Sequence, residues 1–103
     1  MAEIAMVVKL TAVEGKVDEL LEVAAKLVAG TEGEDGTLQY VVHTDTADPN
    51  AIWFYERYAD QAALDTHAGS TTMADAMGSF AGLLGAPPEM HLLSIAQAKG
   101  AAG

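Results

Sequence analysis

The sequence predicts a single α+β domain in which one antiparallel sheet carries its helices on one side. Three kinds of pattern predict it: short β-branched runs, segments whose apolar residues recur at spacings of three and four, and Gly or Pro turns between them. With 103 residues, half of them hydrophobic, the chain can bury one core and no second one. We therefore expect one domain over residues 1–98 and a short frayed tail at 99–103.

The amino-terminal third is expected to form a strand followed by a helix. Residues 3–12 are a short, β-branched and apolar run closed by the turn Glu14-Gly15-Lys16, which is typical of a strand. Beyond the turn, apolar residues recur at helical spacing among charged ones: Val17, Leu20, Leu21, Ala24, Leu27 and Val28. This pattern predicts an amphipathic helix with one buried stripe, ended by the glycines within residues 30–36.

Two strands are expected in the middle of the chain, at residues 37–45 and 51–59. They form the most aromatic part of the sequence. The turn Ala47-Asp48-Pro49-Asn50 between them is typical of a hairpin, so the two strands should lie side by side and antiparallel.

Two helices and a last strand are expected after the hairpin. Asp60 is the predicted N-cap of a short helix, and Ser70 or Thr71 begins a second helix. Gly85 and the two prolines that follow it separate this helix from a final strand at residues 89–98. The resulting order, β-α-β-β-α-(α)-β, is that of the ferredoxin-like βαββαβ fold with a four-stranded antiparallel sheet.

Both faces of this sheet are expected to be apolar, which predicts a homodimer. Successive strand residues point to opposite faces, so a half-solvated sheet should alternate apolar and polar residues. In the third strand, apolar residues fill both sets instead: Ile52, Phe54 and Tyr58 on one face, Trp53 and Tyr55 on the other. Helices can cover only one face, so we expect two subunits to pack sheet against sheet. The alternative is a moderately apolar second face that loops and the tail cover.

The charge balance and the composition exclude several classes of partner. Fifteen acidic residues against five basic ones give a formal net charge of −10, so the chain repels nucleic acid backbones and anionic lipid headgroups. We expect neither nucleic acid nor membrane as a partner. The sequence lacks cysteine, and no basic segment precedes the apolar run at its amino end, which together favour a cytoplasmic location.

No metal site and no cofactor are expected. The pairs His43 with Asp45 and Glu89 with His91 each share a strand face, but neither pair has further ligands at a recognisable spacing. The glycines of residues 30–36 follow a helix and precede a strand, which is the reverse of a dinucleotide-binding turn.

Two residues are candidates for a catalytic role. His67 lies three residues after Leu64 and shares the inward side of its helix, where an imidazole could transfer a proton near neutral pH. It could instead be a structural histidine bonded to a backbone carbonyl. Arg57, the only arginine, could hold a phenolate or carboxylate, or could form a cross-strand or inter-subunit ion pair. Because Arg57 and Glu56 must point to opposite faces, we expect one of them to be partly buried.

Aromatic and methionine side chains could line a binding site for a small flat aromatic molecule. Aromatic rings suit a planar ligand, and methionine adapts to varied shapes. The candidates are Tyr40, Trp53, Tyr55, Met73, Met77 and Phe80. The alternative for each of them is a place in the hydrophobic core.

Five groups of short segments follow one another along the chain. They are Val8-Lys9-Leu10-Thr11-Ala12, Glu14-Gly15-Lys16 with Glu19-Leu20-Leu21, Tyr55-Glu56-Arg57-Tyr58, Ala63-Leu64-Asp65-Thr66-His67 with Ser70, and Pro87-Pro88-Glu89. Each is ordinary alone, but together, over about residues 4–95, they resemble the antibiotic biosynthesis monooxygenase family. The resemblance implies a dimeric α+β barrel with a pocket in each subunit between sheet and helices. It also implies oxygenation of quinols, anthrones and related polyphenols by molecular oxygen, without flavin or metal.

The resemblance also implies roles for individual residues. A protein that serves this reaction has to bind a flat phenol, help remove its proton, stabilise the anion and keep water out. His67, or a water that it holds, would assist proton transfer, and Arg57 or a tyrosine hydroxyl would steady the oxyanion. The slot for the substrate would be shaped by Tyr40, Trp53, Met77 and Phe80.

Haem degradation, which some similar proteins carry out, is disfavoured. Those members use a histidine about ten residues beyond the position of His67 and an asparagine on the first strand. This chain has Met77 at the former place and residues such as Ala5 and Met6 near the latter. Two other functions stay open: a non-catalytic module that binds an aromatic metabolite in the same pocket, and a purely structural role.

Overall fold

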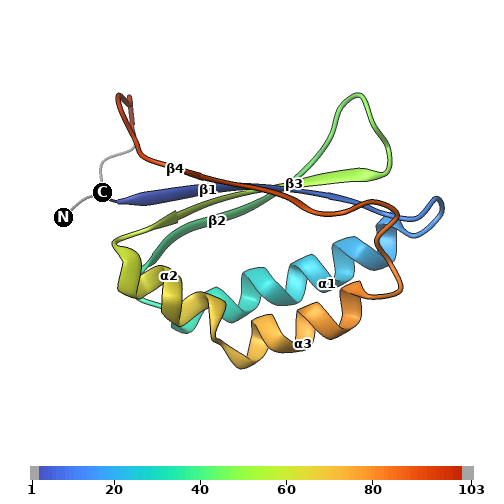
Figure 1. Ribbon diagram of the computed structural model, residues 1–103, viewed down its shortest axis with the longest axis horizontal. Helices are drawn as coiled ribbons and strands as arrows, with labels where there is room; N and C mark the ends of the chain where they lie inside the picture. The colour runs from blue at the N-terminus through green and yellow to red at the C-terminus, as the bar shows by residue number, and fades with distance from the viewer. Residues whose placement is uncertain (1–2, 101–103) are drawn as a thin grey trace.

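The computed structural model describes residues 3–100 and shows a two-layer α+β fold (Figure 1). One layer is a four-stranded antiparallel sheet in the order β2-β3-β1-β4. Its strands are β1 (Ile4–Thr11), β2 (Thr37–Thr44), β3 (Ala51–Tyr58) and β4 (Glu89–Leu93). The other layer consists of α1 (Val17–Gly30), α2 (Gln61–Ala68) and α3 (Thr71–Phe80), with a short 3-10 helix, η1 (Thr31–Gly33), after α1. This arrangement confirms the predicted ferredoxin-like βαββαβ fold.

The helices all lie against one face of the sheet, the inner face, and leave the opposite, outer face uncovered (Figure 1). The strand register assigns side chains to the two faces. Val8 of β1 lies opposite Phe54 of β3, and the next residue, Lys9, lies opposite Trp53. Phe54 is buried in the core and so lies on the inner face, and because strand residues alternate, Trp53 lies on the outer face.

The two shorter helices begin at the caps that the sequence predicts. Oδ1 of Asp60 accepts a hydrogen bond from the backbone N–H of Ala63 at 2.9 Å. Oγ of Ser70 accepts one from the N–H of Met73 at 3.1 Å. Each cap satisfies an N–H that the first helical turn would otherwise leave unpaired. The caps therefore fix where α2 and α3 begin, and with that the side chains that face the sheet.

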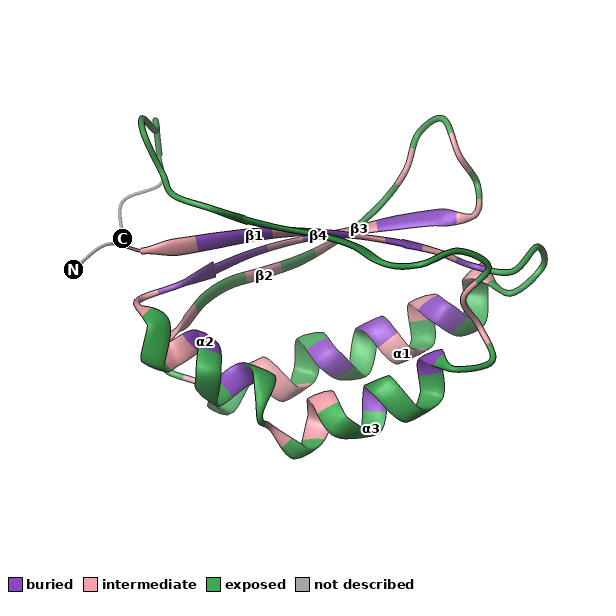
Figure 2. Ribbon diagram, in the orientation of Figure 1, coloured by how far each residue is buried: buried purple, intermediate pink, exposed green. Residues whose placement is uncertain are grey.

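The core lies between the inner face and the helices, as the buried stripes in Figure 2 show. Leu20, Ala24 and Leu27 form the buried stripe of α1. Leu20, Tyr58 and Ile52 are among the most deeply buried side chains, and such burial stabilises the fold by roughly 1.5–3 kcal/mol for each large apolar side chain. The edge strand β4 is exposed along its whole length. The space beneath the sheet therefore stays open at this edge.

Helix α3 ends at Phe80, earlier than the sequence predicts, because the chain turns back onto the end of β1. The carbonyl of Leu83 accepts a hydrogen bond from the N–H of Val13 at 2.8 Å, and the N–H of Gly85 donates to the carbonyl of Thr11 at 2.8 Å. A Cβ at position 85 would lie 3.1 Å from the carbonyl oxygen of Ala12, so this approach favours glycine. These contacts join segments far apart in the sequence, which local periodicity does not reveal.

Strand β4 is also shorter than the expected strand at 89–98. Its last residue, Leu93, lies opposite Ala5, and β1 begins only one residue before Ala5. The following residues have no neighbouring strand to pair with, and they rise from the sheet on its outer side (Figure 1). Residues 1–2 and 101–103, which include part of the expected tail, lie outside the described residues.

The outer face is only partly apolar, unlike the inner one. One row across the sheet consists of Val41, Tyr55, Val7 and His91. The neighbouring rows contain Arg57 and Lys9, and Nζ of Lys9 lies 4.0 Å from Oε2 of Glu89. The inner face is thus apolar as expected. The outer face is apolar only in part, because charged side chains lie in the rows on both sides of its apolar row.

Candidate functional site

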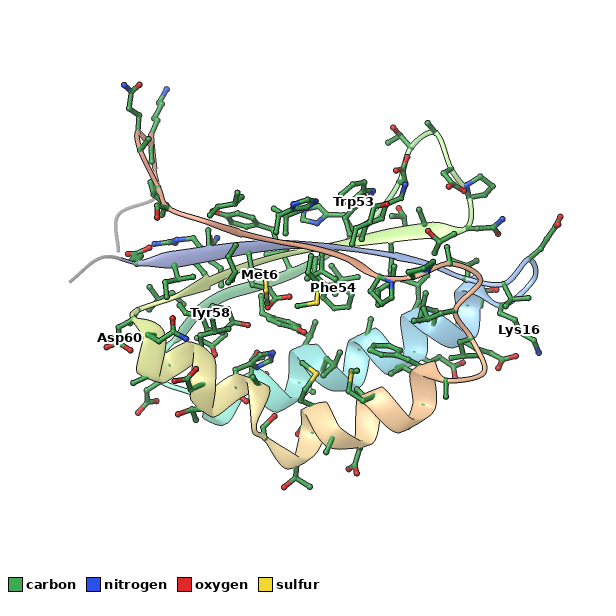
Figure 3. All side chains as sticks on the ribbon, viewed as in Figure 1. Met6, Lys16, Trp53, Phe54, Tyr58 and Asp60 are labelled. Carbon is green, nitrogen blue, oxygen red and sulfur yellow. The ribbon has the colours of Figure 1, made fainter. Side chains whose placement is uncertain are left out.

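A cavity of about 720 Å³ lies between the inner face of the sheet and the helices. Its wall is mostly apolar and includes Met6 and Phe54, which point from the sheet toward the helices, whereas Trp53 points away (Figure 3). Met77, Met90 and Leu92 also line the cavity and are 60, 62 and 63% exposed, so its mouth lies between α3 and β4. The cavity is large enough for a small organic ligand.

Polar side chains gather at one end of this cavity. Four of the lining residues carry side-chain nitrogen or oxygen atoms: Tyr40, Glu56, Asp65 and His67. Tyr40 of β2 lies directly opposite Glu56 of β3 in the sheet. The ring centroids of Tyr40 and His67 are 5.0 Å apart. The cavity therefore has a polar end between β2, β3 and α2, and an apolar body beneath the rest of the sheet.

His67 is 2% exposed and is paired with an acidic residue from a distant part of the sequence. Its Nδ1 lies 2.9 Å from Oε1 of Glu34, and the hydroxyl of Thr37 donates to the same oxygen at 2.9 Å. The backbone of Glu34 is held as well, because its N–H donates to Thr31 and its carbonyl accepts from Thr37. Nε2 of His67 is buried and has no hydrogen-bond partner within residues 3–100. An unpartnered buried polar atom calls for an explanation, and a ligand in the cavity that His67 lines is one.

Glu34 reaches His67 because the chain passes very close to α2. The backbone of Gly36 packs against Ala63, and a Cβ at position 36 would overlap with the Cβ of Ala63. The carbonyl of Gly36 also accepts a hydrogen bond from the N–H of Ala59 at 2.9 Å. The absence of a side chain at Gly36 therefore brings the segment that carries Glu34 against the helix that carries His67.

Glu56 is a second buried carboxylate at the polar end and is 2% exposed. Its Oε1 accepts a hydrogen bond from the hydroxyl of Tyr58. Burial raises the pKa of Glu56, and the hydrogen bond from Tyr58 and the charge of His67 oppose that shift. Burial likewise raises the pKa values of Tyr40 and Tyr58, and the nearby carboxylates of Glu56 and Glu34 raise them further. Both tyrosines therefore keep their hydroxyl protons at physiological pH.

The structure brings together five of the residues that the sequence singles out as site candidates. His67 and Tyr40 lie at the polar end of the cavity. Met73, Met77 and Phe80 line its apolar body from α3. These five residues come from β2, α2 and α3, and all line the same cavity.

Arg57, Trp53 and Tyr55 lie on the outer face, so the structure corrects the expectation that they share this site. In the β2–β3 register, Tyr40 lies opposite Glu56, and Val41 lies opposite Tyr55. Tyr40 and Glu56 line the cavity, so the odd-numbered residues of β3 must point to the other side of the sheet. Alternation along a single strand separates the two sets, but it does not say which set faces the helices.

The outer-face candidates have partners of their own. Nε and Nη2 of Arg57 donate to Oε1 of Glu3 at 3.0 and 2.7 Å, and Nη1 donates to Oε1 of Gln39 at 3.1 Å. Arg57 therefore forms an ion pair, which was the alternative to a role in binding an anion. Nε1 of Trp53 donates to Oδ2 of Asp45 at 2.8 Å. These contacts pin both side chains to the outer surface.

Glu34 and Glu56, which both belong to the polar end, were not predicted from the sequence. A signal existed for Glu56, because it shares strand parity with Phe54 and Tyr58 and so interrupts an otherwise apolar face with a carboxylate. Glu34 lies between two glycines in a segment without periodicity, and its pairing with His67 depends on the close approach of Gly36 to α2. Only the tertiary structure reveals that contact.

The family model for antibiotic biosynthesis monooxygenases matches residues 3–79 of the sequence. The chain belongs to the antibiotic biosynthesis monooxygenase family. The match runs from the start of β1 nearly to the end of α3, so it includes Tyr40, Glu56 and His67 at the polar end of the cavity. None of the curated proteins matches the sequence.

Solved structures of bacterial proteins are similar to this antibiotic biosynthesis monooxygenase family member over nearly its whole length. PA3566 of Pseudomonas aeruginosa is 25% identical, with a TM-score of 0.87, and the match covers 94% of this chain and 97% of that one. NE2512 of Nitrosomonas europaea, a protein of unknown function, is 26% identical, with a TM-score of 0.85 and coverage of 100% and 98%. A candidate antibiotic biosynthesis monooxygenase of Caulobacter crescentus is 23% identical, with a TM-score of 0.88 and coverage of 93% and 92%, and shows likeness of fold.

Two further findings concern membranes and metals. Within residues 3–100, this family member has no helix that is both long and apolar enough to cross a membrane. In the same part of the chain, no three His, Asp or Glu side chains lie close enough together to hold a metal ion.

Proposed function

We propose that this family member is a cofactor-independent monooxygenase that oxidises a small aromatic quinol or anthrone-type substrate with molecular oxygen. One observation carries the proposal: a buried imidazole, His67, lies at the polar end of an otherwise apolar cavity, and its Nε2 has no partner among the described residues. A base in a site that excludes water is what this reaction needs, because the deprotonated substrate gives an electron to oxygen far more readily than the neutral phenol does.

In this proposal, Nε2 of His67 takes the proton that activates the substrate. The resulting anion passes an electron to oxygen, and the two radicals combine. One oxygen atom stays on the ring carbon, and the other leaves as water with two hydrogens, so a quinol becomes a hydroxylated quinone and an anthrone becomes an anthraquinone. The hydroxyl of Tyr40, which keeps its proton, is the donor on the cavity wall that can steady the oxyanion. Arg57 has no part in this step because it lies on the outer face.

The apolar body of the cavity would hold the ring system. Phe54 and Phe80 supply aromatic surfaces, and Met73 and Met77 supply flexible ones, all on the cavity wall. A flat substrate that fills this space would displace water from the neighbourhood of His67. That exclusion favours transfer of an electron to oxygen over unproductive proton exchange with solvent.

We also propose that the chain works as a homodimer in which the outer faces of two sheets pack together. The helices leave this face uncovered (Figure 1). Val41 and Leu93 lie on this face and are 38 and 45% exposed. Tyr55 and Trp53 lie on the same face and are half-buried. A dimer built in this way leaves the cavity on the inner face of each subunit open to a substrate.

Oxygen uptake with a panel of hydroquinones and anthrones tests the enzymatic proposal. We expect uptake with at least one compound, one atom of labelled oxygen in the product, and a rate lower by about a hundredfold or more in His67→Ala. The control is His43→Ala, which removes an exposed histidine of the outer face and should keep the rate. An unchanged rate in His67→Ala would remove His67 from the mechanism. If none of the compounds leads to oxygen uptake, the result would favour a module that binds an aromatic metabolite without converting it.

A further inference from the structure

The polar end of the cavity carries no lysine or arginine to balance an anionic ligand. All five Lys and Arg residues lie within the described part of the chain, and none of them lines the cavity. Three carboxylates lie at this end instead: Glu56 and Asp65 on the wall, and Glu34 directly behind His67. A carboxylate or phosphate entering this space would lose its hydration and meet like charges.

The pairing with Glu34 decides which nitrogen of His67 can accept a hydrogen bond. An ionised carboxylate accepts hydrogen bonds only, and Oε1 of Glu34 already accepts one from the hydroxyl of Thr37. Nδ1 of His67, 2.9 Å from the same oxygen, must therefore carry the hydrogen that closes this contact. In the neutral ring, Nε2 then keeps its lone pair. No residue within 3–100 donates to it.

A second acceptor lies at the same end of the cavity. The carboxylate of Glu56 lines the wall, and its Oε1 accepts a hydrogen bond from Tyr58. Its Oε2 has no hydrogen-bond partner among the described residues. Glu56 and His67 both line this cavity. Tyr40 links them, since it lies opposite Glu56 in the sheet and its ring contacts that of His67.

We propose that this end of the cavity is a hydrogen-bond acceptor site. Glu34 holds His67 as the Nδ1–H tautomer, so that Nε2 and the Glu56 carboxylate both accept hydrogen bonds. The site therefore selects uncharged ligands with a hydroxyl donor and rejects carboxylic and phosphoric acids. The inference rests on the proposed function in taking this cavity as the substrate site. It narrows the substrate to a neutral phenol or alcohol with an apolar body. Glu34 is a positioning residue, because it acts through His67.

Nitrogen NMR of the imidazole rings tests the role of Glu34 directly. In the wild-type protein, labelled at histidine nitrogen, we expect a protonated Nδ1 and a lone pair on Nε2 for His67. Glu34→Ala should shift His67 toward the Nε2–H tautomer that histidine prefers in water, and Glu34→Gln should retain the wild-type tautomer, because its amide oxygen can still accept. The exposed His43 and His91 serve as internal references. A hydrogen on Nε2 in the wild-type protein, or no change in Glu34→Ala, would overturn the assignment.

Three ligands of matched shape test the selection. Calorimetry with 4-hexylphenol, 4-hexylanisole and 4-hexylbenzoate compares a hydroxyl donor, its methyl ether and an anion on the same apolar body. We expect the phenol to bind at least about tenfold more tightly than the ether, because the ether leaves a buried acceptor unpaired, and the benzoate to bind most weakly. In His67→Leu the preference for phenol over ether should fall to about twofold or less. Equal binding of phenol and ether by the wild-type protein would overturn the proposal.

These measurements separate the inference from the proposed function. If the protein prefers the phenol and shows the expected tautomer but consumes no oxygen with any quinol, the acceptor site stands and the oxygenase proposal fails. If it consumes oxygen but binds phenol and ether equally, the oxygenase proposal stands and the acceptor site fails.

Discussion

Two neighbouring residues of β3 show two ways in which this chain buries a charge. Arg57 and Glu56 point to opposite faces and are 5 and 2% exposed. Arg57 has an ion-pair partner in Glu3 on the outer face, whereas Glu56 on the apolar inner face accepts a hydrogen bond from the hydroxyl of Tyr58. A hydroxyl offsets less of the cost of burying a charge than an opposite charge does, which agrees with the raised pKa of Glu56. Stability and the proposed acceptor role therefore conflict at Glu56.

Replacement of this carboxylate should change how stability depends on pH. Because the pKa of Glu56 is raised on folding from its ordinary value of 4.5, the folded chain binds more protons than the unfolded chain at pH values above 4.5 and below the raised pKa. The contribution of Glu56 to the free energy of unfolding of the wild-type protein therefore falls as pH rises through that window, and it becomes constant above the raised pKa. Glu56→Gln removes this loss and can still accept the hydrogen bond from Tyr58. We therefore expect the variant to gain stability relative to wild type as pH rises above 4.5.

Urea unfolding at a series of pH values measures this difference in the free energy of unfolding. Glu22→Gln changes an exposed carboxylate of α1 and is the control that should not show the slope. A difference between Glu56→Gln and wild type that stays constant with pH would mean that Glu56 is solvated in the folded protein.

At the scale of elements, the starts of α2 and α3 could be predicted and their surroundings could not. Asp60 and Ser70 act through hydrogen bonds within their own first turns, so a local sequence pattern reveals them. Helical spacing likewise indicated that His67 faces inward. The end of α3 and the pairing of His67 with Glu34 depend on contacts between distant segments. Local patterns carry no information about such contacts, which explains why Glu34 was not predicted as a partner of His67.

The contact between Gly36 and α2 gives a prediction for this scale. Gly36→Ala should destabilise the protein by about 1–3 kcal/mol, because the new methyl group must push Ala63 and its helix away. Gly33→Ala is the matched control: no atom lies within 4 Å of the added carbon, so its effect should stay within about 1 kcal/mol and can be stabilising. Chemical unfolding of both variants checks the prediction. Equal costs for the two substitutions would show that the backbone at Gly36 and α2 do not approach closely.

At the scale of the whole molecule, one layer of helices leaves the sheet half covered. The inner face gains a core and a cavity, while the outer face keeps Val41, Tyr55 and Leu93 among charged pairs. The apolar character of the aromatic strands was evident from the sequence. Lys9 and Arg57 interrupt the same face, so its apolar area is smaller than the strand pattern implied. Such a mixed surface, with an apolar row between ion pairs, is typical of an interface between subunits.

A pair of valine substitutions tests whether that surface joins two subunits. Val41 in the apolar row of the outer face and Val28 on α1 are 38 and 36% exposed, so a lysine at either position costs a single chain about the same. In a sheet-to-sheet dimer only Val41→Lys buries an unpaired ammonium group, and we expect it to weaken association by about a hundredfold or more while Val28→Lys leaves it unchanged. Sedimentation velocity over a range of protein concentrations measures both.

Because each subunit carries a net charge of −10, added salt should strengthen the wild-type dimer by screening repulsion. A wild-type protein that sediments as a monomer would exclude the dimer, and a Val41→Lys variant that stays dimeric would place the interface on another surface.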